Sequence, residues 1–238
     1  MQIIPVIDLL NSVVVQAKQG DRKNYQPIQS QLTDSHQALD IVAALLAVYP
    51  FEQLYIADLD AIQKLGGTYK TNYNVIRCIQ KRYPNLKLWV DAGISNSTEL
   101  NFWVKSGVKL VIGSENFARL DNYLVIKKSL HDNFILSLDL MPQGYQGPIE
   151  LFEKAIYWPN EVIVMSLANV GANLGVNTPL ISDIKQRSAN TQLYAAGGVR
   201  SVEDLNQLAL MGVSGTLVAS ALHQKQLTSV DCAIAIVN

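Results

Sequence analysis

The amino-acid sequence predicts an α/β fold of the TIM barrel type, a closed (β/α)8 barrel built from two duplicated half-barrels. Three observations predict it: eight short apolar runs alternate with segments of helical period, no linker interrupts the 238 residues, and one stretch occurs twice. Eight strand–helix units at this chain length fit a closed barrel better than an open doubly wound sheet. We therefore expect one domain over residues 1–238, with halves of roughly 1–130 and 131–238.

Each expected strand is short and rich in apolar residues, which is typical of a parallel sheet whose outer side is covered by helices. In chain order, strands are predicted over 2–8, 54–58, 86–91, 108–113, 133–139, 161–167, 191–196 and 214–220. The intervening segments have apolar residues at helical spacing. They predict helices over 36–49, 73–83, 97–107, 121–130, 148–158, 179–188 and 201–212.

The repeated stretch covers a strand, a glycine turn, a helix and the start of the next strand. Residues 88–117 read LWVDAGISNSTELNFWVKSGVKLVIGSENF, and residues 193–222 read LYAAGGVRSVEDLNQLALMGVSGTLVASAL. The two copies align when Gly93 is placed on Gly198. A repeat at about half the chain length, with four strand–helix units in each half, predicts a barrel made of two half-barrels. Chance similarity between strand–turn–helix units is the alternative.

Composition and charge argue against several classes of protein. A formal net charge of -1 and an isoelectric point near 6.3 give no electrostatic reason to expect nucleic acid or an anionic membrane as a partner. The first ten residues read as a strand rather than a signal, and the longest apolar stretches are too short to span a bilayer. Cys78 and Cys232 lack any CxxC or Cys/His spacing, which indicates buried thiols in a reducing cytoplasm. We expect a cytoplasmic monomer or small homo-oligomer.

Two sets of small residues lie where strands are followed by helices, which is where the site of a barrel is built. The second copy contributes Gly197, Gly198, Ala219 and Ser220, and the first copy contributes Gly93, Gly113 and Ser114. Glycine lets backbone N–H groups approach a ligand, and a helix N-terminus favours phosphate. Each set therefore predicts a phosphate cradle for a small phosphorylated substrate, unless the glycines only form tight turns. The second set fits better, because Asp91 would repel a phosphate beside the first.

Two aspartates end strands at matching places in the two halves. The segments VIDLL (6–10) and SLDLM (137–141) are similar, which places Asp8 opposite Asp139. Two acids that face each other across the barrel mouth form a usable general acid/base pair if the site shifts their pKa values. Either aspartate could instead cap a helix or form an ion pair.

Other polar residues give less specific signals. Asp58 and Asp60 end the second strand, where joining the site and capping a helix are equal alternatives. Arg22 and Lys23 lie in the long first loop and could steer an anion, although such loop charges are more often solvated. The three histidines lack carboxylate or thiol companions at metal spacing, and neither a Walker-type P-loop nor a GxSxG motif occurs. We expect neither a metal nor a cofactor.

Several segments together resemble the HisA/HisF family of histidine biosynthesis over essentially the whole chain. They are IIPVIDLLNSVVVQAKQGD (3–21), LYIADLDA (54–61), GVKLVIGS (107–114) and AAGGVRSVEDLNQLALMGVSGTLVASALH (195–223). The resemblance implies a barrel of two half-barrels, a ligand with a phosphate at each end, and acid–base catalysis by aspartates. It also implies that Asp8 and Asp139 match catalytic aspartates and that the two sets of small residues match the two cradles.

The sequence departs from the family pattern at three places. Ala219-Ser220 stands where the family usually has Gly-Arg, and Asp91-Ala92-Gly93-Ile94-Ser95 stands where it typically reads Gly-Gly-Gly-Ile-Arg. In the loop after the sixth strand, Ser166 keeps a hydroxyl, but Gly171 stands where the family's isomerase has its second catalytic aspartate. Losing a general acid typically removes a factor of about 10²–10⁴ in rate.

Three functions follow from these observations. The first is a diverged enzyme of this family that performs an Amadori-type isomerisation, or related chemistry, on a phosphorylated sugar-like or heterocycle-linked substrate. In it, Asp8 would act with Asp139, or with a water held by Ser166, as the acid/base pair. The second is the orthodox ProFAR isomerase of histidine biosynthesis. The third is a non-catalytic protein that binds a phosphorylated ligand.

Overall fold

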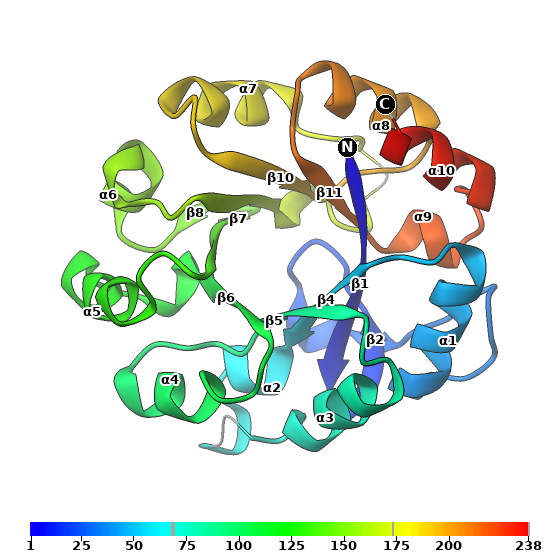
Figure 1. Cartoon of the computed structure of the whole chain (residues 1–238), viewed down its shortest axis with the longest axis horizontal. Coiled ribbons are helices and arrows are strands. Elements are labelled where there is room, and N and C mark those ends of the chain that lie inside the picture. The colour runs from blue at the N-terminus through cyan, green and yellow to red at the C-terminus, as the bar shows by residue number, and fades with distance from the viewer. Residues whose placement is uncertain (68–69, 173, 238) are drawn as a thin grey trace.

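Eight parallel strands close into a barrel in the computed structural model of the chain, which describes residues 1–67, 70–172 and 174–237 (Figure 1). The barrel strands are β1 (Gln2–Leu10), β4 (Gln53–Asp58), β5 (Lys87–Asp91), β6 (Lys109–Gly113), β7 (Ile135–Met141), β9 (Glu161–Ser166), β10 (Gln192–Ala196) and β11 (Gly215–Val218). Neighbours pair in that order, and β11 pairs back with β1. This closure confirms the predicted fold class.

Helices connect the strands and cover the outside of the barrel (Figure 1). They are α1 (Ala38–Val48), α2 (Leu59–Ile62), α3 (Tyr73–Arg82), α4 (Ser97–Trp103), α5 (Leu120–Leu130), α6 (Ile149–Glu153), α7 (Thr178–Arg187), α8 (Val202–Leu210), α9 (Ser220–His223) and α10 (Ser229–Val237). Short 3-10 turns cover Arg22–Asn24, Leu65–Gly67, Ser114–Asn116, Ala155–Tyr157 and Leu167–Asn169. Within the described part of the chain, none of the helices has the length and apolarity that crossing a membrane requires.

Some boundaries differ from the sequence prediction for local reasons. The helix expected over 97–107 ends at Trp103, and the chain then turns through Gly107, whose φ is +78°. The helix expected over 148–158 splits into α6 and a 3-10 turn, because the backbone of Lys154 is extended. The last barrel strand stops at Val218 because α9 begins two residues later, and α10 was not predicted.

Short additional strands follow the first strand of each predicted half. They are β2 (Val13–Gln16) and β3 (Gln26–Pro27) after β1, and β8 (Gly144–Gln146) after β7. The antiparallel register pairs Asp8 with Val15 on β2 and Asp139 with Gln146 on β8. In both hairpins the partner lies seven residues beyond the aspartate. The matching register is what duplicated half-barrels would produce, and it fixes the backbone around both aspartates.

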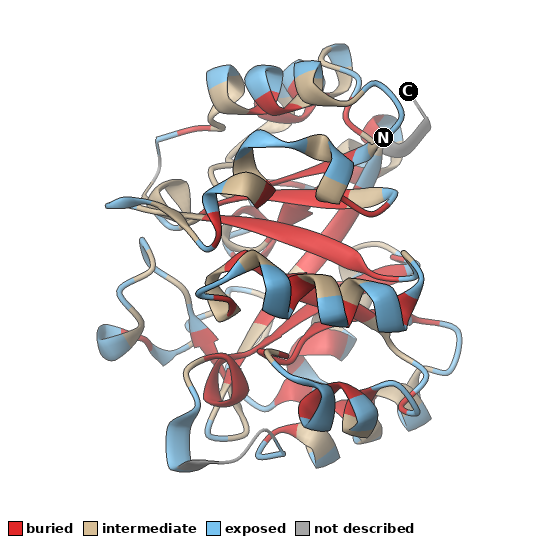
Figure 2. Cartoon of the chain, turned by 90° about the vertical axis from the view of Figure 1, so that its left-hand side faces the viewer, coloured by how far each residue is buried: buried red, intermediate tan, exposed pale blue. Residues whose placement is uncertain are grey.

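The apolar core has two layers, one between the strands and helices and one inside the barrel. Figure 2 shows that the strands are buried along most of their length, whereas the helices are buried on one side only. Inside the barrel, Trp89 and Tyr194 pack edge to face with ring centroids 4.9 Å apart. These two residues are equivalent in the repeat alignment. Because side chains from alternate strands fill the barrel interior, the cavity that the inward-facing aspartates border lies at the barrel mouth.

Candidate active site

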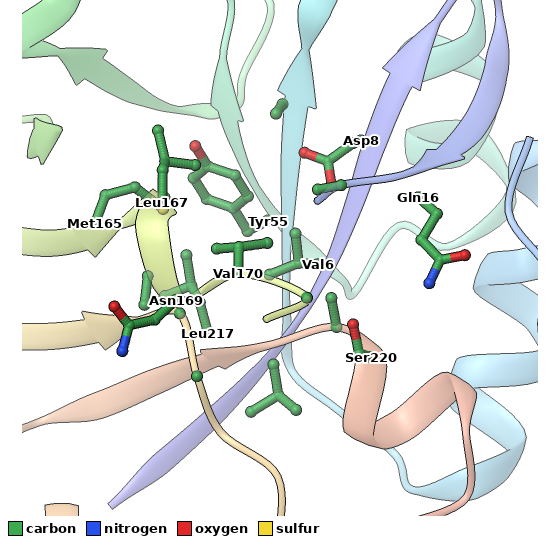
Figure 3. Close-up of a pocket in the computed structure, with 18 of the residues that line it drawn as sticks. Val6, Asp8, Gln16, Tyr55, Met165, Leu167, Asn169, Val170, Leu217 and Ser220 are labelled. Carbon is green, nitrogen blue, oxygen red and sulfur yellow. The ribbon is translucent and has the colours of Figure 1, made fainter. Parts of the chain in front are cut away.

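A cavity of about 290 Å³ opens at the carboxyl ends of the barrel strands (Figure 3). Successive side chains of a strand point to opposite faces, so β1 directs Ile4, Val6 and Asp8 to the barrel interior. The same alternation directs Asp91 of β5 and Asp139 of β7 inward. The cavity wall therefore combines carboxylates with apolar side chains, which include Val6, Met165, Leu167 and Leu217.

Asp8 and Asp139 lie on the wall of this one cavity, as the sequence led us to expect. They differ in their surroundings. Asp139 is buried, and its carboxylate accepts hydrogen bonds from the Ser137 hydroxyl (2.6 Å) and the Glu115 backbone N–H (3.1 Å). Asp8 is half-buried, and within the described part of the chain its carboxylate accepts no hydrogen bond. Figure 3 shows the Asp8 carboxylate turned toward the ring of Tyr55.

The protein environment shifts the acidity of these carboxyl groups toward neutral pH. Burial raises the pKa of Asp8 to about 7, and the Arg22 guanidinium opposes this shift. Burial and the charge of Glu115 raise the pKa of Asp139, against the hydrogen bond from Ser137. Burial and the charge of Asp139 raise the pKa of Asp91 well above its ordinary value. Carboxyl groups of this kind can release and take up protons near neutral pH, which acid–base catalysis requires.

The predicted second phosphate cradle is assembled on the cavity wall. Gly197, Gly198, Ala219 and Ser220 all line the cavity. Gly197 and Gly198 have φ values of +98° and +95°, and a Cβ atom would lie 2.3 Å from the Ser166 carbonyl oxygen in one case and 2.0 Å from the Gly175 carbonyl oxygen in the other. Only glycine fits these positions, because any side chain would collide with backbone.

Unpaired donors converge at this cradle. The backbone N–H groups of Gly198 and Ser220 donate to no other group within the described residues. Ser220 begins α9, and Ser201 occupies the N-cap of α8, so the ends of two helices that carry partial positive charge lie beside the cradle. Such an arrangement suits an anion.

The predicted first cradle has different contacts. In the described structure none of Gly93, Gly113 and Ser114 lies on the cavity wall. The Gly93 N–H donates to Asp91 Oδ1 (3.0 Å), and a Cβ atom at Gly93 would lie 2.6 Å from the Ala61 carbonyl oxygen. A Cβ atom at Gly113 would lie 3.0 Å from Asp139 Oδ2 and 3.1 Å from Asp91 Oδ2. The assignment of these residues to a phosphate stays a prediction, and the neighbouring carboxylates weigh against it.

Ser114 is fully buried and positions Asp139 instead of facing the cavity. Its hydroxyl accepts a hydrogen bond from the Asp139 backbone N–H (2.9 Å) and donates to the Gln146 carbonyl oxygen (2.7 Å). The contact to Gln146 ties the turn after β6 to β8. Ser114 therefore holds together the hairpin that carries Asp139.

The loop after β9 places the remaining predicted residues. The buried Ser166 hydroxyl donates to Asn169 Oδ1 (3.0 Å), and Asn169 Nδ2 donates to the Gly175 carbonyl oxygen (2.7 Å). Ser166 thus shapes this loop, and it is not among the residues of the cavity wall. Gly171 does line the cavity, but its φ is +63° and a Cβ atom there would lie 2.8 Å from the Ala17 carbonyl oxygen. The backbone would have to move to accommodate an aspartate at this position.

Sequence reasoning missed an ion pair across the cavity mouth. Arg22 bonds both carboxylate oxygens of Glu115, at 2.8 and 2.5 Å, and each side chain is only 15% exposed. The expectation that Arg22 is solvated is therefore wrong. These residues lie 93 positions apart, so no local sequence signal connects them. Tyr55 was also missed; it lines the cavity, and only the alternation of its strand could have indicated this.

Of Asp58 and Asp60, only Asp58 caps a helix, whereas Asp60 lies within α2 and bonds neighbouring loops. Asp58 accepts a hydrogen bond from the Ala61 N–H (3.1 Å) as the N-cap of α2, and it also accepts from Asn72 (2.6 Å). Asp60 accepts from Asn72 (2.9 Å) and from the Asn11 N–H (2.7 Å). Neither aspartate reaches the cavity wall.

The chain is similar in sequence to proteins of histidine biosynthesis over nearly its whole length. The model of a family described as "Histidine biosynthesis protein" matches residues 2–228. An uncharacterized protein of Methanocaldococcus jannaschii is 26% identical over 232 residues, which cover 94% of each chain. Proteins of Caldicellulosiruptor bescii and Halothermothrix orenii, both named as phosphoribosyl imidazole-4-carboxamide isomerases, are each 26% identical over 95% of this chain and 96% of their own.

Proposed function

We propose that this chain, which belongs to the histidine biosynthesis protein family, is an isomerase-like enzyme that uses Asp8 and Asp139 as an acid/base pair on a small phosphorylated substrate. One observation carries this proposal. Two carboxylates with raised pKa values share a cavity with a glycine turn in which the Gly198 N–H donates to no described residue. Acid–base chemistry beside a bound phosphate is the activity that such a site supports best.

The proposed reaction is the isomerisation of an aminoaldose to an aminoketose. Asp8 donates its proton to the ring oxygen as the bond between that oxygen and C1 breaks, and the nitrogen lone pair forms the C1=N bond. Asp139 then removes the proton from C2, the electron pair left behind forms the C1=C2 bond, and the electron pair of the C1=N double bond returns to nitrogen. Loss of the hydroxyl proton at C2 and protonation of C1 complete an isomerisation with no net loss of atoms or electrons.

Burial raises the pKa of both aspartates, so it is their different hydrogen bonds that support this division of roles. Asp139 accepts hydrogen bonds at both oxygens, from Ser137 and from the Glu115 N–H, and such bonds favour the ionised form that a base needs. Asp8 accepts none from the described residues, and burial raises its pKa to about 7, so near neutral pH a large fraction carries the proton that an acid must give. Asp139 thereby takes the role of the catalytic aspartate that the family's isomerase has at the position of Gly171.

The test follows the C2 hydrogen of the glycosylamine formed from ribose 5-phosphate and ammonia. In D2O, NMR should show protein-dependent replacement of this hydrogen by deuterium, and the replacement should be lost in Asp139→Asn. Exchange no faster than without protein, or unchanged exchange in both Asp8→Asn and Asp139→Asn, contradicts the proposal.

The names of the relatives favour a second candidate, the ProFAR isomerase of histidine biosynthesis. Growth of a histidine auxotroph that lacks this isomerase decides between the two. Rescue by the wild-type chain, but not by Asp8→Asn, supports the second candidate. Failure to grow despite expression of the folded protein counts against it.

A further inference from the structure

We infer that the ligand of this cavity carries a phosphate at one end only, and that its other end carries a protonated amine or amidinium held by Asp91 and the Tyr55 hydroxyl. The inference rests on the proposed function for the phosphate end and extends it to the class of substrate. The inferred ligand differs from the ligand with a phosphate at each end that the resemblance to the HisA/HisF family implies.

The end of the cavity beyond the glycine cradle is acidic. Asp91, Glu115 and Asp139 converge there from β5, the 3-10 turn after β6, and β7. The cation nearest to them is Arg22, and both of its terminal nitrogens are bonded to Glu115. Arg22 also acts on Asp91 and Asp139 through its charge, but its hydrogen bonds go to Glu115, so one cation faces three carboxylates. A second phosphate at this end would be repelled by both aspartates.

Two buried polar groups at this end lack a partner. Asp91 and Tyr55 line the cavity, and each is only 3% exposed. Asp91 Oδ1 accepts the Gly93 N–H at 3.0 Å, which orients the carboxylate, but Oδ2 bonds no described residue. The Tyr55 hydroxyl likewise bonds none. Both atoms are open to the cavity rather than enclosed in the core, so a ligand in the cavity can supply the donors that they accept.

Asp91 Oδ2 and Asp139 Oδ2 lie close to each other at this end. A Cβ atom at Gly113 would lie 3.0 Å from Asp139 Oδ2, 3.1 Å from Asp91 Oδ2 and 3.0 Å from Asn116 Nδ2, so the two carboxylates border the same point. An ammonium group offers three donors and no acceptor. It can therefore bond Asp91 Oδ2 and the Tyr55 oxygen while its charge offsets that of Asp139.

Two further observations limit the ligand. Among residues 1–67, 70–172 and 174–237, no three His, Cys, Asp or Glu side chains form a group that could hold a metal ion, which favours an organic cation at the acidic end. The cavity volume of about 290 Å³ lies at the lower limit of pockets for small molecules, which span about 300–1,000 Å³. A compact ligand with one phosphate fits this volume better than one with two ribose phosphates.

The test uses the whole chain and three probes of matched length: pentyl phosphate, 5-aminopentyl phosphate and pentane-1,5-bisphosphate. Calorimetric titration near neutral pH gives the three dissociation constants. We expect the amine probe to bind at least about tenfold more tightly than pentyl phosphate, because a charged hydrogen bond contributes that much or more. The bisphosphate should bind no more tightly than pentyl phosphate.

Three variants assign the effect to residues. Asp91→Asn and Tyr55→Phe should each reduce the preference for the amine probe and leave the affinity for pentyl phosphate unchanged. Tyr55→Phe keeps the ring and so guards against loss of folding. Gly198→Ala, at the phosphate end, should weaken all three probes by a similar factor, because its Cβ atom would lie 2.0 Å from the Gly175 carbonyl oxygen and displace the turn.

Equal binding of pentyl phosphate and 5-aminopentyl phosphate would overturn the inference and leave the proposed function standing. Tightest binding of the bisphosphate, strengthened further in Asp91→Asn, would overturn it in favour of a ligand with two phosphates. If the folded protein binds none of the probes, the phosphate end fails, and both the proposed function and the inference fail with it.

Discussion

The turn after β5 and the turn after β10 share a scaffold but differ in chemistry. In the first, the Ser95 N–H donates to Glu99 at 2.8 Å; in the second, the Arg200 N–H donates to Asp204 at 2.9 Å. The repeat aligns these donors and these acceptors with each other. Each bond ties the turn to the first part of the helix that follows, α4 or α8. The shared scaffold supports the proposed duplication of a half-barrel.

The difference lies where the strands end. β5 ends in Asp91, then Ala92, at the positions where β10 has Ala196 and is followed by Gly197. One turn therefore presents a carboxylate, and the other presents backbone at the cavity wall. In the two halves, the residues that hold the turn in place are chemically similar, whereas the residues that face the cavity differ. The ligand contacts of the two halves should accordingly differ.

The largest expected effect is on catalysis. Asp139→Asn should reduce deuterium exchange at C2 by a factor of about 10²–10⁴, because the base is lost while the shape of the side chain is kept. Asp183→Asn is the matched control, since Asp183 is an exposed residue of α7 paired with Arg187 (2.6 Å). An exchange rate in Asp139→Asn equal to that of the control would exclude Asp139 as the base.

The equivalent glycines of the two turns provide the next contrast. Gly198→Ala and Gly93→Ala should each lower the free energy of unfolding by about 1–3 kcal/mol, because both have positive φ and both Cβ atoms would meet a backbone carbonyl. Only Gly198→Ala should also weaken the binding of inorganic phosphate. Urea unfolding and phosphate titration measure the two effects.

Gly66→Ala is the control for this pair, since Gly66 has φ +62° but, its chain neighbours aside, no atom of a described residue lies within 4 Å of a Cβ position. Gly66→Ala should lower the free energy of unfolding by only about 1 kcal/mol, which is the strain of the left-handed backbone alone. Phosphate binding weakened equally by Gly93→Ala and Gly198→Ala would break the distinction between the two turns.

Restoring the carboxylate that the family's isomerase carries should not increase the activity of this chain. Gly171→Asp is expected to lower the free energy of unfolding by about 1–3 kcal/mol, because φ is +63° and the Ala17 carbonyl oxygen lies 2.8 Å from the Cβ position. Thermal unfolding and the C2 exchange assay measure the outcome. A faster exchange in this variant would show that Asp139 does not supply the missing function.

The most gradual effect concerns pH. The pKa of Asp8 is about 7 in the folded protein, against about 3.9 in an unfolded chain. Between these values the folded state keeps a proton that the unfolded chain releases, so the contribution of Asp8 to the free energy of unfolding falls as pH rises. Relative to the wild type, the free energy of unfolding of Asp8→Asn should rise by about 1 kcal/mol for each pH unit between about 4 and 7. Parallel pH profiles of the two proteins would contradict the raised pKa.

The fold and the placement of the aspartates were predictable because both depend on local periodicity. Apolar runs define the strands, and their alternation directs Asp8 and Asp139 to the same side of a closed sheet. The ion pair between Arg22 and Glu115 was not predictable, because it joins loops that only the closed barrel brings together. The orientation of Ser166 was also inaccessible, since it depends on the bond to Asn169 within an irregular loop.

One end of the cavity is expected to bind phosphate, and the other end is expected to repel it. A crystal structure of the protein soaked in inorganic phosphate tests this difference most directly. We expect one phosphate, bonded by the backbone N–H groups of Gly198 and Ser220. A phosphate between Asp91 and Asp139, or an unoccupied glycine cradle at saturating phosphate, would contradict this expectation.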